Sequence, residues 1–250
     1  SHLGRKTAVI GTVGNGFPPF GDKPGALTPA LNTTPDAIEL QQRLAFYRQQ
    51  GAAACAMEVS SHGLAQGRVN GTVFNVAVLT NLSRDHLDYH GDMESYADAK
   101  ARLFNWPGLE WVVVNVDDAF GQRLESQTRP PARVASYGFQ RGAVVGEKLR
   151  LSQAGLHLTV HTDWGNAEID APLLGRFNAA NLLAVLTTLL VSGIKLDDAC
   201  RALPYITPPP GRMQTFGGDA HPLVVVDYAH TPDALEKVLA TLRETVSGGR

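Results

Sequence analysis

Runs of apolar residues that end in polar clusters predict the strands of a buried sheet. The central pair reads AAACAMEV at 52–59 and TVFNVAVLTNL at 72–82, and further runs occupy 7–13 and 110–116. A continuous run rich in Val and Ala is typical of a strand buried on both faces of a parallel sheet. A short strand is also expected at 134–137.

Segments with helix start and stop signals lie between these strands. Thr34, followed by Pro35 at the first helical position, predicts a helix at 35–50 that ends before Gly51. Asp117 and Asp118 mark the start of another helix. Three more helices are expected at 93–104, 176–192 and 196–203. The segment 14–29 is rich in Gly and Pro and is expected to be a loop. The alternation of strands and helices predicts an α/β fold with a mostly parallel sheet flanked by helices.

The pattern changes in the second half of the chain. Polar and apolar residues alternate across 147–172, which predicts a small antiparallel β subdomain with one exposed face. The sequence TPPPG at 207–211 is a stiff break and predicts a domain boundary. The residues 223–244 then predict a strand, a polar turn and an amphipathic helix, the first unit of a second α/β domain. We therefore expect domains at 1–206 and 207–250.

Polar residues gather where the two central strands end. The first cluster contains Glu58, Ser60, Ser61 and His62; the second contains Asn81, Ser83, Arg84, Asp85, His86 and Asp88. Ligands of parallel sheets bind beyond the carboxyl ends of the strands. These residues therefore predict a site for a metal ion and phosphate groups at one edge of the sheet.

The residue types leave alternatives open at this stage. Glu58 suits a Mg²⁺ ligand, but a carboxylate that caps a helix or turn has the same pattern. His86 could be a ligand or a base, or a histidine hydrogen-bonded within its loop. Lys100 alone is typical of a surface lysine, and Asn181 of a polar position on a core helix.

Two other chemistries are disfavoured. Ser60, Ser61 and His62 are adjacent, and neighbouring residues rarely place a hydroxyl and an imidazole for nucleophilic attack. The glycines at 11, 14 and 16 lack the lysine and hydroxyl of a phosphate-binding loop, so we interpret them as turn residues.

Composition narrows the class of protein. The net charge of −2 gives no basic field that would favour nucleic acid. No apolar run reaches the length of a membrane span, and no secretory signal is present, so a cytoplasmic protein is expected. Cys55 and Cys200 lie in apolar contexts and are interpreted as core residues.

Five motifs together resemble the Mur ligase family, in its order and spacing. They are AMEVSSHGLAQGRV, TNLSRDHLDYHG followed by YADAK, GRFNAANLLAVL, PGRMQTF and VVVDYAHTPDALEKVL. The resemblance is closest to the members that extend the peptidoglycan stem peptide by a diamino acid. It implies a central domain related to P-loop NTPases, followed by the first β–α unit of a Rossmann-like C-terminal domain.

The resemblance also implies an activity and its partners. ATP would phosphorylate the terminal carboxylate of UDP-MurNAc-L-Ala-D-Glu, and the amine of meso-diaminopimelate or L-lysine would displace phosphate from the acyl phosphate. Mg²⁺ would align the anions. A monomer that binds neither nucleic acid nor membrane is expected.

Site residues follow from the matched motifs. Glu58 and His86 resemble the family's metal ligands, and Lys100 its carbamylated lysine, which needs a lowered pKa. The implied substrate contacts are Asn32, Thr33, Thr34, Ser60, Gln66 and Arg68. The implied ATP contacts are Asn181, Arg212, Asp227, Tyr228 and His230.

Departures from the family pattern set a limit. The G-T-N-G-K-T type loop expected before Thr7 is not in the sequence, and neither is the D-N-P-R type motif that selects the diamino acid. We therefore expect a central-domain fragment that is inactive alone. A non-catalytic ligand-binding fragment and a folylpolyglutamate-type ligase remain as alternatives.

Overall fold

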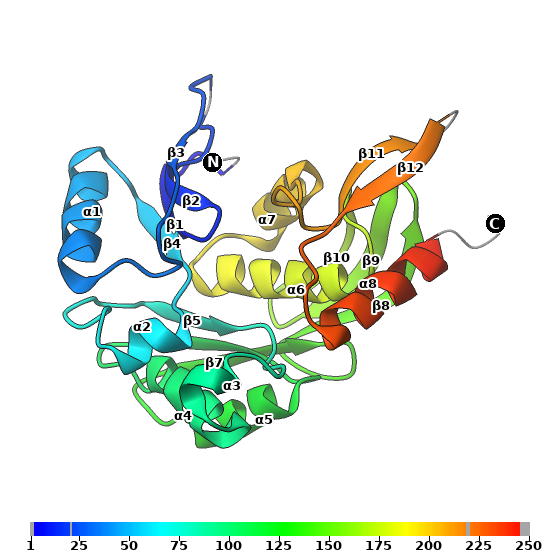
Figure 1. The fold of residues 1–250 in the computed structure, drawn as a ribbon. Coiled ribbons are helices and arrows are strands. Elements are labelled where there is room, and N and C mark those ends of the chain that lie inside the picture. The colour runs from blue at the N-terminus through cyan, green and yellow to red at the C-terminus, as the bar shows by residue number, and fades with distance from the viewer. Residues whose placement is uncertain (1–2, 21, 219–220, 246–250) are drawn as a thin grey trace. The chain divides into compact units, whose positions relative to one another are not determined.

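The computed structural model describes residues 3–20, 22–218 and 221–245 and divides the chain into two compact units (Figure 1). The first unit comprises Ser1–Ala77 and Arg84–Glu110, and the second Val78–Ser83 and Trp111–Arg250. The predicted domain boundary at 207–211 lies inside the second unit and stays a prediction.

The first unit contains a four-stranded sheet with the strand order β3-β2-β1-β4. Its strands are β1 (Thr7–Gly11), β2 (Gly14–Phe17), β3 (Ala26–Thr28) and β4 (Ala54–Met57). The pair β1–β4 is parallel, with Thr7 opposite Ala54, whereas β1–β2 and β2–β3 are antiparallel. The carboxyl ends of β1 and β4 therefore lie at the same edge of the sheet.

The prediction of a loop at 14–29 was wrong, because β2 and β3 occupy part of it. Gly14 and Gly16 have φ values of 138° and 146°, which side chains rarely allow. A Cβ on Gly16 would lie 2.1 Å from the carbonyl oxygen of Ala26 on β3. The glycines interpreted as turn residues therefore allow close strand pairing.

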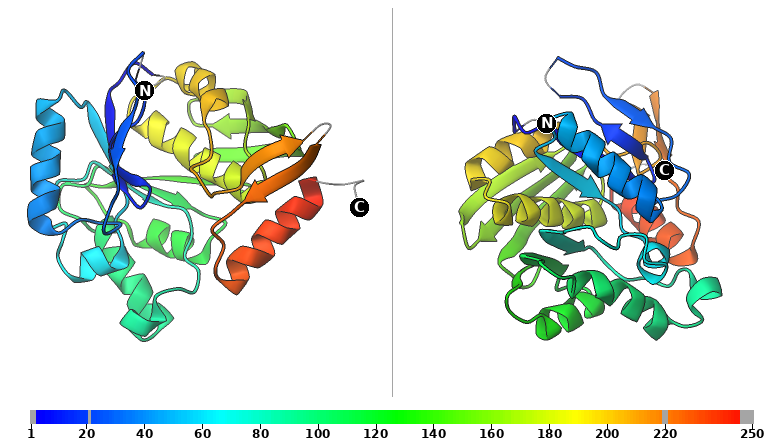
Figure 2. Two further views of the ribbon diagram at one scale, coloured as in Figure 1. Left: turned by 45° about the horizontal axis from the view of Figure 1, so that its top comes forward. Right: turned by 90° about the vertical axis from the view of Figure 1, so that its left-hand side faces the viewer.

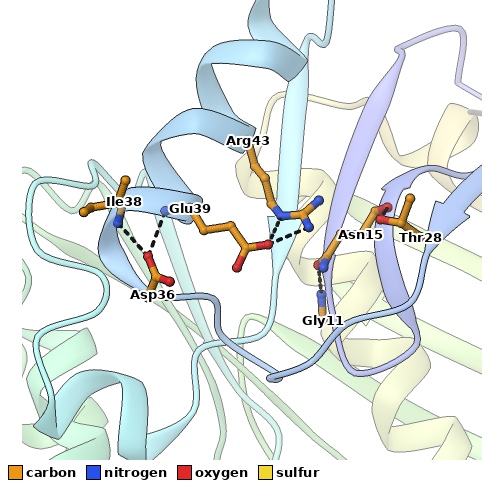
Figure 3. Close-up of polar contacts among 7 residues, drawn as sticks. All are labelled: Gly11, Asn15, Thr28, Asp36, Ile38, Glu39 and Arg43. Atoms are coloured by element: carbon orange, nitrogen blue, oxygen red, sulfur yellow. Dashed lines mark hydrogen bonds and ion pairs between the residues drawn. The ribbon is translucent and has the colours of Figure 1, made fainter.

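The helix α1 (Ala37–Gln49) begins two residues later than predicted, and its N-cap is Asp36 rather than Thr34. An Asp36 carboxylate oxygen accepts hydrogen bonds from the backbone N–H groups of Ile38 and Glu39 at 3.0 and 2.9 Å (Figure 3). Gly51, with φ of 78°, follows the end of the helix as predicted. Both Asp and Thr are good caps, so sequence preference alone did not decide between them.

The expectation that β4 is buried on both faces was also wrong. Ala54, Cys55 and Ala56 are exposed, and β4 is an edge strand of its sheet. Cys55 is therefore not a core residue, and Cys200 is half-buried.

Three further helices complete the first unit: α2 (Ser61–Ala65), α3 (Leu87–His90) and α4 (Met93–Phe104). The bounds of α4 match the predicted helix at 93–104. The helix α1 lies beside the sheet (Figures 1 and 2). The buried core of this unit contains Ala8, Ile10, Leu40, Tyr47, Leu64 and Val69.

The second unit is built on a six-stranded sheet with the order β10-β9-β8-β7-β6-β5. Its strands are β5 (Val76–Leu79), β6 (Trp111–Asn115), β7 (Arg133–Gly138), β8 (Val144–Ser152), β9 (Gly155–Thr162) and β10 (Gly165–Ala171). The pairs β6–β7 and β7–β8 are parallel, whereas β8–β9 and β9–β10 are antiparallel. The predicted antiparallel strands therefore exist and continue the parallel sheet.

Helices cover both faces of this mixed sheet. The helices α5 (Ala119–Gln127) and α6 (Arg176–Val191) lie on opposite faces (Figures 1 and 2). As predicted for a strand between two helical layers, Val112, Val113 and Val114 of β6 are fully buried. After α6 come α7 (Leu196–Ala202) and the 3₁₀ helix η1 (Leu203–Tyr205).

The end of the chain contains the predicted strand and helix, here β12 (His221–Val226) and α8 (Pro232–Thr245). A strand that was not predicted, β11 (Gln214–Gly218), pairs antiparallel with β12. Within the described residues, no helix combines the length and apolar character needed to cross a bilayer.

Candidate functional site

The carboxylate of Glu58 lies at the carboxyl end of β4, against the end of β1. Its Oε2 accepts hydrogen bonds from the backbone N–H of Thr12 at 3.2 Å and from the Thr12 hydroxyl at 2.7 Å. A Cβ on Gly11 would lie 2.9 Å from Glu58 Oε1. The carboxylate therefore caps the turn after β1, which is the alternative role considered for it. It also presents oxygen, the ligand atom that Mg²⁺ prefers.

A buried side chain stabilises the turn to which the Glu58 carboxylate is hydrogen-bonded. Asn15 is 3% exposed, and its side-chain oxygen accepts a hydrogen bond from the backbone N–H of Gly11 at 3.3 Å (Figure 3). The hydroxyl of Thr28 donates to the Asn15 carbonyl at 3.0 Å. Residues of β2 and β3 thus stabilise the backbone at the end of β1, next to the Glu58 carboxylate.

The segment Asn32, Thr33 and Thr34 places three side chains in different surroundings. Asn32 is exposed, whereas Thr34 is fully buried. The Thr34 hydroxyl donates to the carbonyl of Glu58 and accepts from the backbone N–H of Ser60, both at 2.9 Å. The hydroxyl of Thr33 lies 3.0 Å from that of Thr12. Thr34 therefore holds the loop against the end of β4, and its hydroxyl is occupied by the protein.

Ser60, Gln66 and Arg68 surround the short helix α2. Ser60 is its N-cap, and its hydroxyl accepts from the N–H of Gly63 at 3.0 Å. The guanidinium of Arg68 donates to the carbonyl of Thr34 at 3.0 Å and to the side chain of Gln66 at 2.8 Å. Arg68 therefore links two other implied substrate residues, Thr34 and Gln66, by hydrogen bonds.

His86 begins a group of aromatic and imidazole rings on α2, α3 and α4. It precedes α3 with φ of 53°, and its N–H donates to Asp85 at 2.8 Å. The ring centroids of His62 and His86 are 4.9 Å apart, and those of His62 and Tyr89 are 4.2 Å apart. Burial lowers the pKa of His62, and the neighbouring His86 lowers it further.

Two hydrogen bonds tie α3 to α2. His90 Nε2 lies 2.9 Å from the hydroxyl of Ser61, which is 1% exposed. The side chain of Gln66 donates to the Tyr89 hydroxyl at 3.2 Å. Tyr89 and His90 were not singled out in the sequence, and the short helix α3 that carries them was not predicted.

Lys100 is half-buried on α4, with its ammonium nitrogen 5.2 Å from the centroid of the Tyr96 ring. Burial lowers the pKa of Lys100, and the negative charge of Asp85 opposes this shift. A lysine of this kind forms its neutral amine at lower pH than an exposed lysine does.

The implied ATP contacts lie in the second unit. Asn181 is exposed on α6, and its amide donates to Asn178 at 3.3 Å. The Asp227 carboxylate accepts from the backbone N–H groups of Met213 and Ala229, both at 2.8 Å. Asp227 therefore joins the residue that precedes β11 to the turn between β12 and α8.

Tyr228 and His230 follow Asp227 on the turn after β12, and Arg212, which precedes β11, lies close to them. The guanidinium carbon of Arg212 lies 5.1 Å from the centroid of the Tyr228 ring, and the Tyr228 and His230 centroids are also 5.1 Å apart. The structure thus brings Arg212, Tyr228 and His230 together. It describes Asn181 on a different element of the unit.

Among the residues that the structure describes, no three His, Cys, Asp or Glu side chains converge in a way that could hold a metal ion. The resemblance implies three metal ligands, Glu58, His86 and a carbamate on Lys100. The carbamate would form by modification of lysine and is not a His, Cys, Asp or Glu side chain, so this absence does not test the implied set. Their joint role stays a prediction.

Sequence comparison gives two domain matches. The Mur ligase middle domain matches residues 1–189, and the Mur ligase, glutamate ligase domain matches residues 211–250.

The relatives that carry the name UDP-N-acetylmuramoyl-L-alanyl-D-glutamate–2,6-diaminopimelate ligase include the following two. The protein from Chromobacterium violaceum is 55% identical over all of this chain and 50% of its own length. The protein from Pseudomonas aeruginosa is 50% identical over 96% of this chain and 48% of its own length. The chain spans about half the length of the curated relatives it matches.

A solved structure with the same name supports the fold. It superposes with a TM-score of 0.84 at 42% identity, over 98% of this chain and 49% of the other.

Proposed function

Because the chain belongs to the Mur ligase family, we propose that it is the central part of an ATP-dependent ligase of the MurE type. This ligase joins a diamino acid to UDP-MurNAc-L-Ala-D-Glu. The observation that carries the proposal is the identity of 55% over the whole chain to a relative named for this reaction. The names of the relatives favour 2,6-diaminopimelate over L-lysine as the diamino acid.

The proposed reaction has two steps. The terminal carboxylate of the dipeptide attacks the γ-phosphorus of ATP, giving an acyl phosphate and ADP. The diamino acid's amine then attacks the acyl carbon, the C–O bond to phosphate breaks, and inorganic phosphate and a proton leave. Both steps bring anions together, so positive charge must offset their repulsion.

Glu58, His86 and carbamylated Lys100 are the residues that would hold Mg²⁺. The ion, when bound, supplies the positive charge that aligns and neutralises the phosphate groups. The lowered pKa of Lys100 supports its role, because carbamylation requires a neutral amine.

The muramoyl dipeptide is proposed to bind in the first unit, at the hydrogen-bonded residues around Thr34 and Arg68. Arg68 is half-buried and suits an anionic group, since its guanidinium offers five donors. Thr34 contributes by holding the loop, because its own hydroxyl is occupied. Asn32, Thr33, Ser60 and Gln66 are the proposed polar contacts.

Arg212, Tyr228, His230 and Asn181 are proposed to contact ATP, and Asp227 to hold the turn that carries Tyr228 and His230. The phosphates would also need a loop that this sequence does not contain. The protein is proposed to act in the cytoplasm, where ATP is available, as a monomer; light scattering of the purified protein tests the last point.

A ligase assay tests the proposal. The full-length ligase should release phosphate from ATP only when both UDP-MurNAc-L-Ala-D-Glu and the diamino acid are present. The 250-residue chain alone should not. Phosphate release by the chain alone that depends on both substrates would contradict the expected division of the active site.

Two alternatives are distinguished by binding and substrate choice. Calorimetric titration of the chain with Mg²⁺, ATP and the UDP-dipeptide detects a non-catalytic binding fragment. A full-length protein that used a folate and glutamate in place of the UDP-dipeptide would support the folylpolyglutamate-type reading. Mass spectrometry of fresh protein supplied with bicarbonate should detect a labile addition of CO₂ at Lys100.

A further inference from the structure

Thr12 joins two groups that the proposed function assigns to different partners. Its hydroxyl lies 2.7 Å from Oε2 of Glu58 and 3.0 Å from the hydroxyl of Thr33. Its backbone N–H donates to the same Glu58 oxygen at 3.2 Å. Three segments far apart in sequence, the end of β1, the end of β4 and the loop before α1, therefore meet at one exposed threonine.

The chemistry of these groups gives the hydrogen bonds a direction. An ionised carboxylate only accepts, so the single hydroxyl proton of Thr12 goes to Glu58. Towards Thr33, Thr12 can then only accept, and Thr33 must donate. The result is a one-way chain from Thr33 through Thr12 to Glu58. It leaves the lone pairs of Thr33 as the acceptors for a ligand.

This chain of hydrogen bonds responds to a ligand at either end. Hydrogen bonds to charged groups are stronger than neutral ones, and bonds in a chain polarise one another. A ligand that donates to Thr33 strengthens the bond that Thr33 makes to Thr12. A cation at Glu58 competes for the oxygen to which Thr12 donates.

We propose that Thr12 is a positioning residue that couples binding of the muramoyl dipeptide at Thr33 to binding of a divalent cation at Glu58. The proposal rests on the proposed function, which assigns those two partners. Because coupling between two sites is reciprocal, each ligand must change the affinity of the other by the same factor.

Calorimetry without ATP tests the coupling through binding rather than turnover. The dissociation constant of UDP-MurNAc-L-Ala-D-Glu is measured in the full-length protein with and without saturating MgCl₂. We expect a change of at least about fivefold in the unsubstituted protein, the lower end of typical coupling. Thr12→Val should bring the ratio close to one, whereas Thr12→Ser, which keeps the hydroxyl, should retain it.

Two further variants identify the route. Thr33→Val removes the hydroxyl at the other end of the hydrogen-bond chain and should also abolish the coupling. The double variant of Thr12 and Thr33 should show no additional loss. Thr215→Val, at an exposed position of β11 in the second unit, is the matched control and should leave the ratio unchanged. Thermal unfolding of each variant establishes that it is folded.

The outcomes separate this inference from the proposed function. An unsubstituted protein that does not bind the UDP-dipeptide contradicts the proposed function. Binding without any effect of MgCl₂, or a Thr12→Val or Thr33→Val variant that keeps the full ratio, overturns the role of Thr12 and leaves the proposed function standing.

Discussion

The guanidinium Nη1 of Arg68 donates a hydrogen bond to the backbone carbonyl of Thr34 over 3.0 Å, joining residues that are 34 positions apart. A second bond, from Nε of Arg68 to Gln66 at 2.8 Å, orients the guanidinium. Arg68 therefore braces the loop that precedes α1, in addition to any contact it makes with a ligand.

Arg68→Met should destabilise the first unit, because it keeps the aliphatic stem but removes the donor to Thr34. We expect a loss of about 1.5–3 kcal/mol, the usual range for a hydrogen bond from a charged group. The stability of Arg68→Lys should lie between those of the original protein and of Arg68→Met, since lysine lacks the planar guanidinium group. Urea unfolding measures the change. The exposed Arg150→Met is the control, and equal unfolding midpoints for the two methionine variants would contradict the bracing role.

Replacing Thr34 and Asp36 separately should distinguish the loop anchor from the helix cap. Thr34→Val leaves the part-buried N–H of Ser60 without its hydroxyl acceptor, which should cost about 1–3 kcal/mol. Asp36→Ala should cost about 1 kcal/mol, the typical loss for a cap, and Asp36→Asn should recover most of it. Denaturant unfolding measures both. If Thr34 were the functional cap, Asp36→Ala would have no effect on stability.

Gly11→Ala should move the Glu58 carboxylate at little cost in stability. The added Cβ would lie 2.9 Å from Glu58 Oε1 and Cδ, and the end of a flexible side chain can shift. We expect weaker Mg²⁺ binding by calorimetry, with an unfolding free energy within about 1 kcal/mol of the original.

Gly121→Ala on α5 is the matched comparison for Gly11. Its Cβ would meet the backbone oxygen of Asn115 at 1.8 Å, and backbone cannot move aside so easily. This variant should lose about 1–3 kcal/mol of stability. A Gly11 variant that loses as much as the Gly121 variant would show that the Glu58 side chain is not free to adjust.

The pair of Glu125 and Arg141 should give the second unit a contribution to stability that depends on pH. The hydrogen bond from Arg141, 2.7 Å long, holds the pKa of Glu125 below its ordinary value of 4.5. The folded state therefore favours the ionised carboxylate, so the contribution is present above pH 4.5 and is lost as pH falls below it.

Thermal unfolding of Glu125→Gln at several pH values measures this contribution. The variant should melt below the original protein near neutral pH, and the two melting temperatures should converge as the solution is acidified. A difference that stays constant down to about pH 3 would mean that ionisation of Glu125 is not its source.

Asp227→Asn should loosen the turn that carries Tyr228 and His230. The carboxylate accepts from two backbone N–H groups, whereas an amide has one acceptor oxygen and a donor that would face the other N–H. We expect a loss of about 1–3 kcal/mol. Urea unfolding measures it, with the exposed Asp163→Asn as control. An unchanged midpoint for Asp227→Asn would leave ATP contact as the simpler role.

The elements that local signals specify were predictable from the sequence. The helix α4 matched its predicted bounds because Asp92 caps its start and no Gly or Pro interrupts it. Gly193 ended α6 for the same kind of local reason. Strands β2 and β3 were missed, since their glycines serve a close approach between strands that a Gly-rich segment does not reveal.

Placing residues at the site from sequence worked only up to their backbone position. The clusters after β4 and β5 were evident as polar residues that follow apolar runs. That Thr34 is buried and bonded to Glu58 and Ser60 depends on a loop folding back over 24 and 26 residues, which no local pattern encodes. Thr12 was missed for the same reason, because it directly follows Gly11 at the end of β1 and has no motif of its own.

The parallel pairing of β1 with β4 has a consequence for the order of folding. The contact between Thr12 and Glu58 spans 46 residues, and the antiparallel turns of β1, β2 and β3 are much shorter. Closing a long chain segment costs more entropy and slows the search for contacts. The hairpins should form early, whereas the Glu58 carboxylate should reach its place only when α1 has already brought β4 alongside β1.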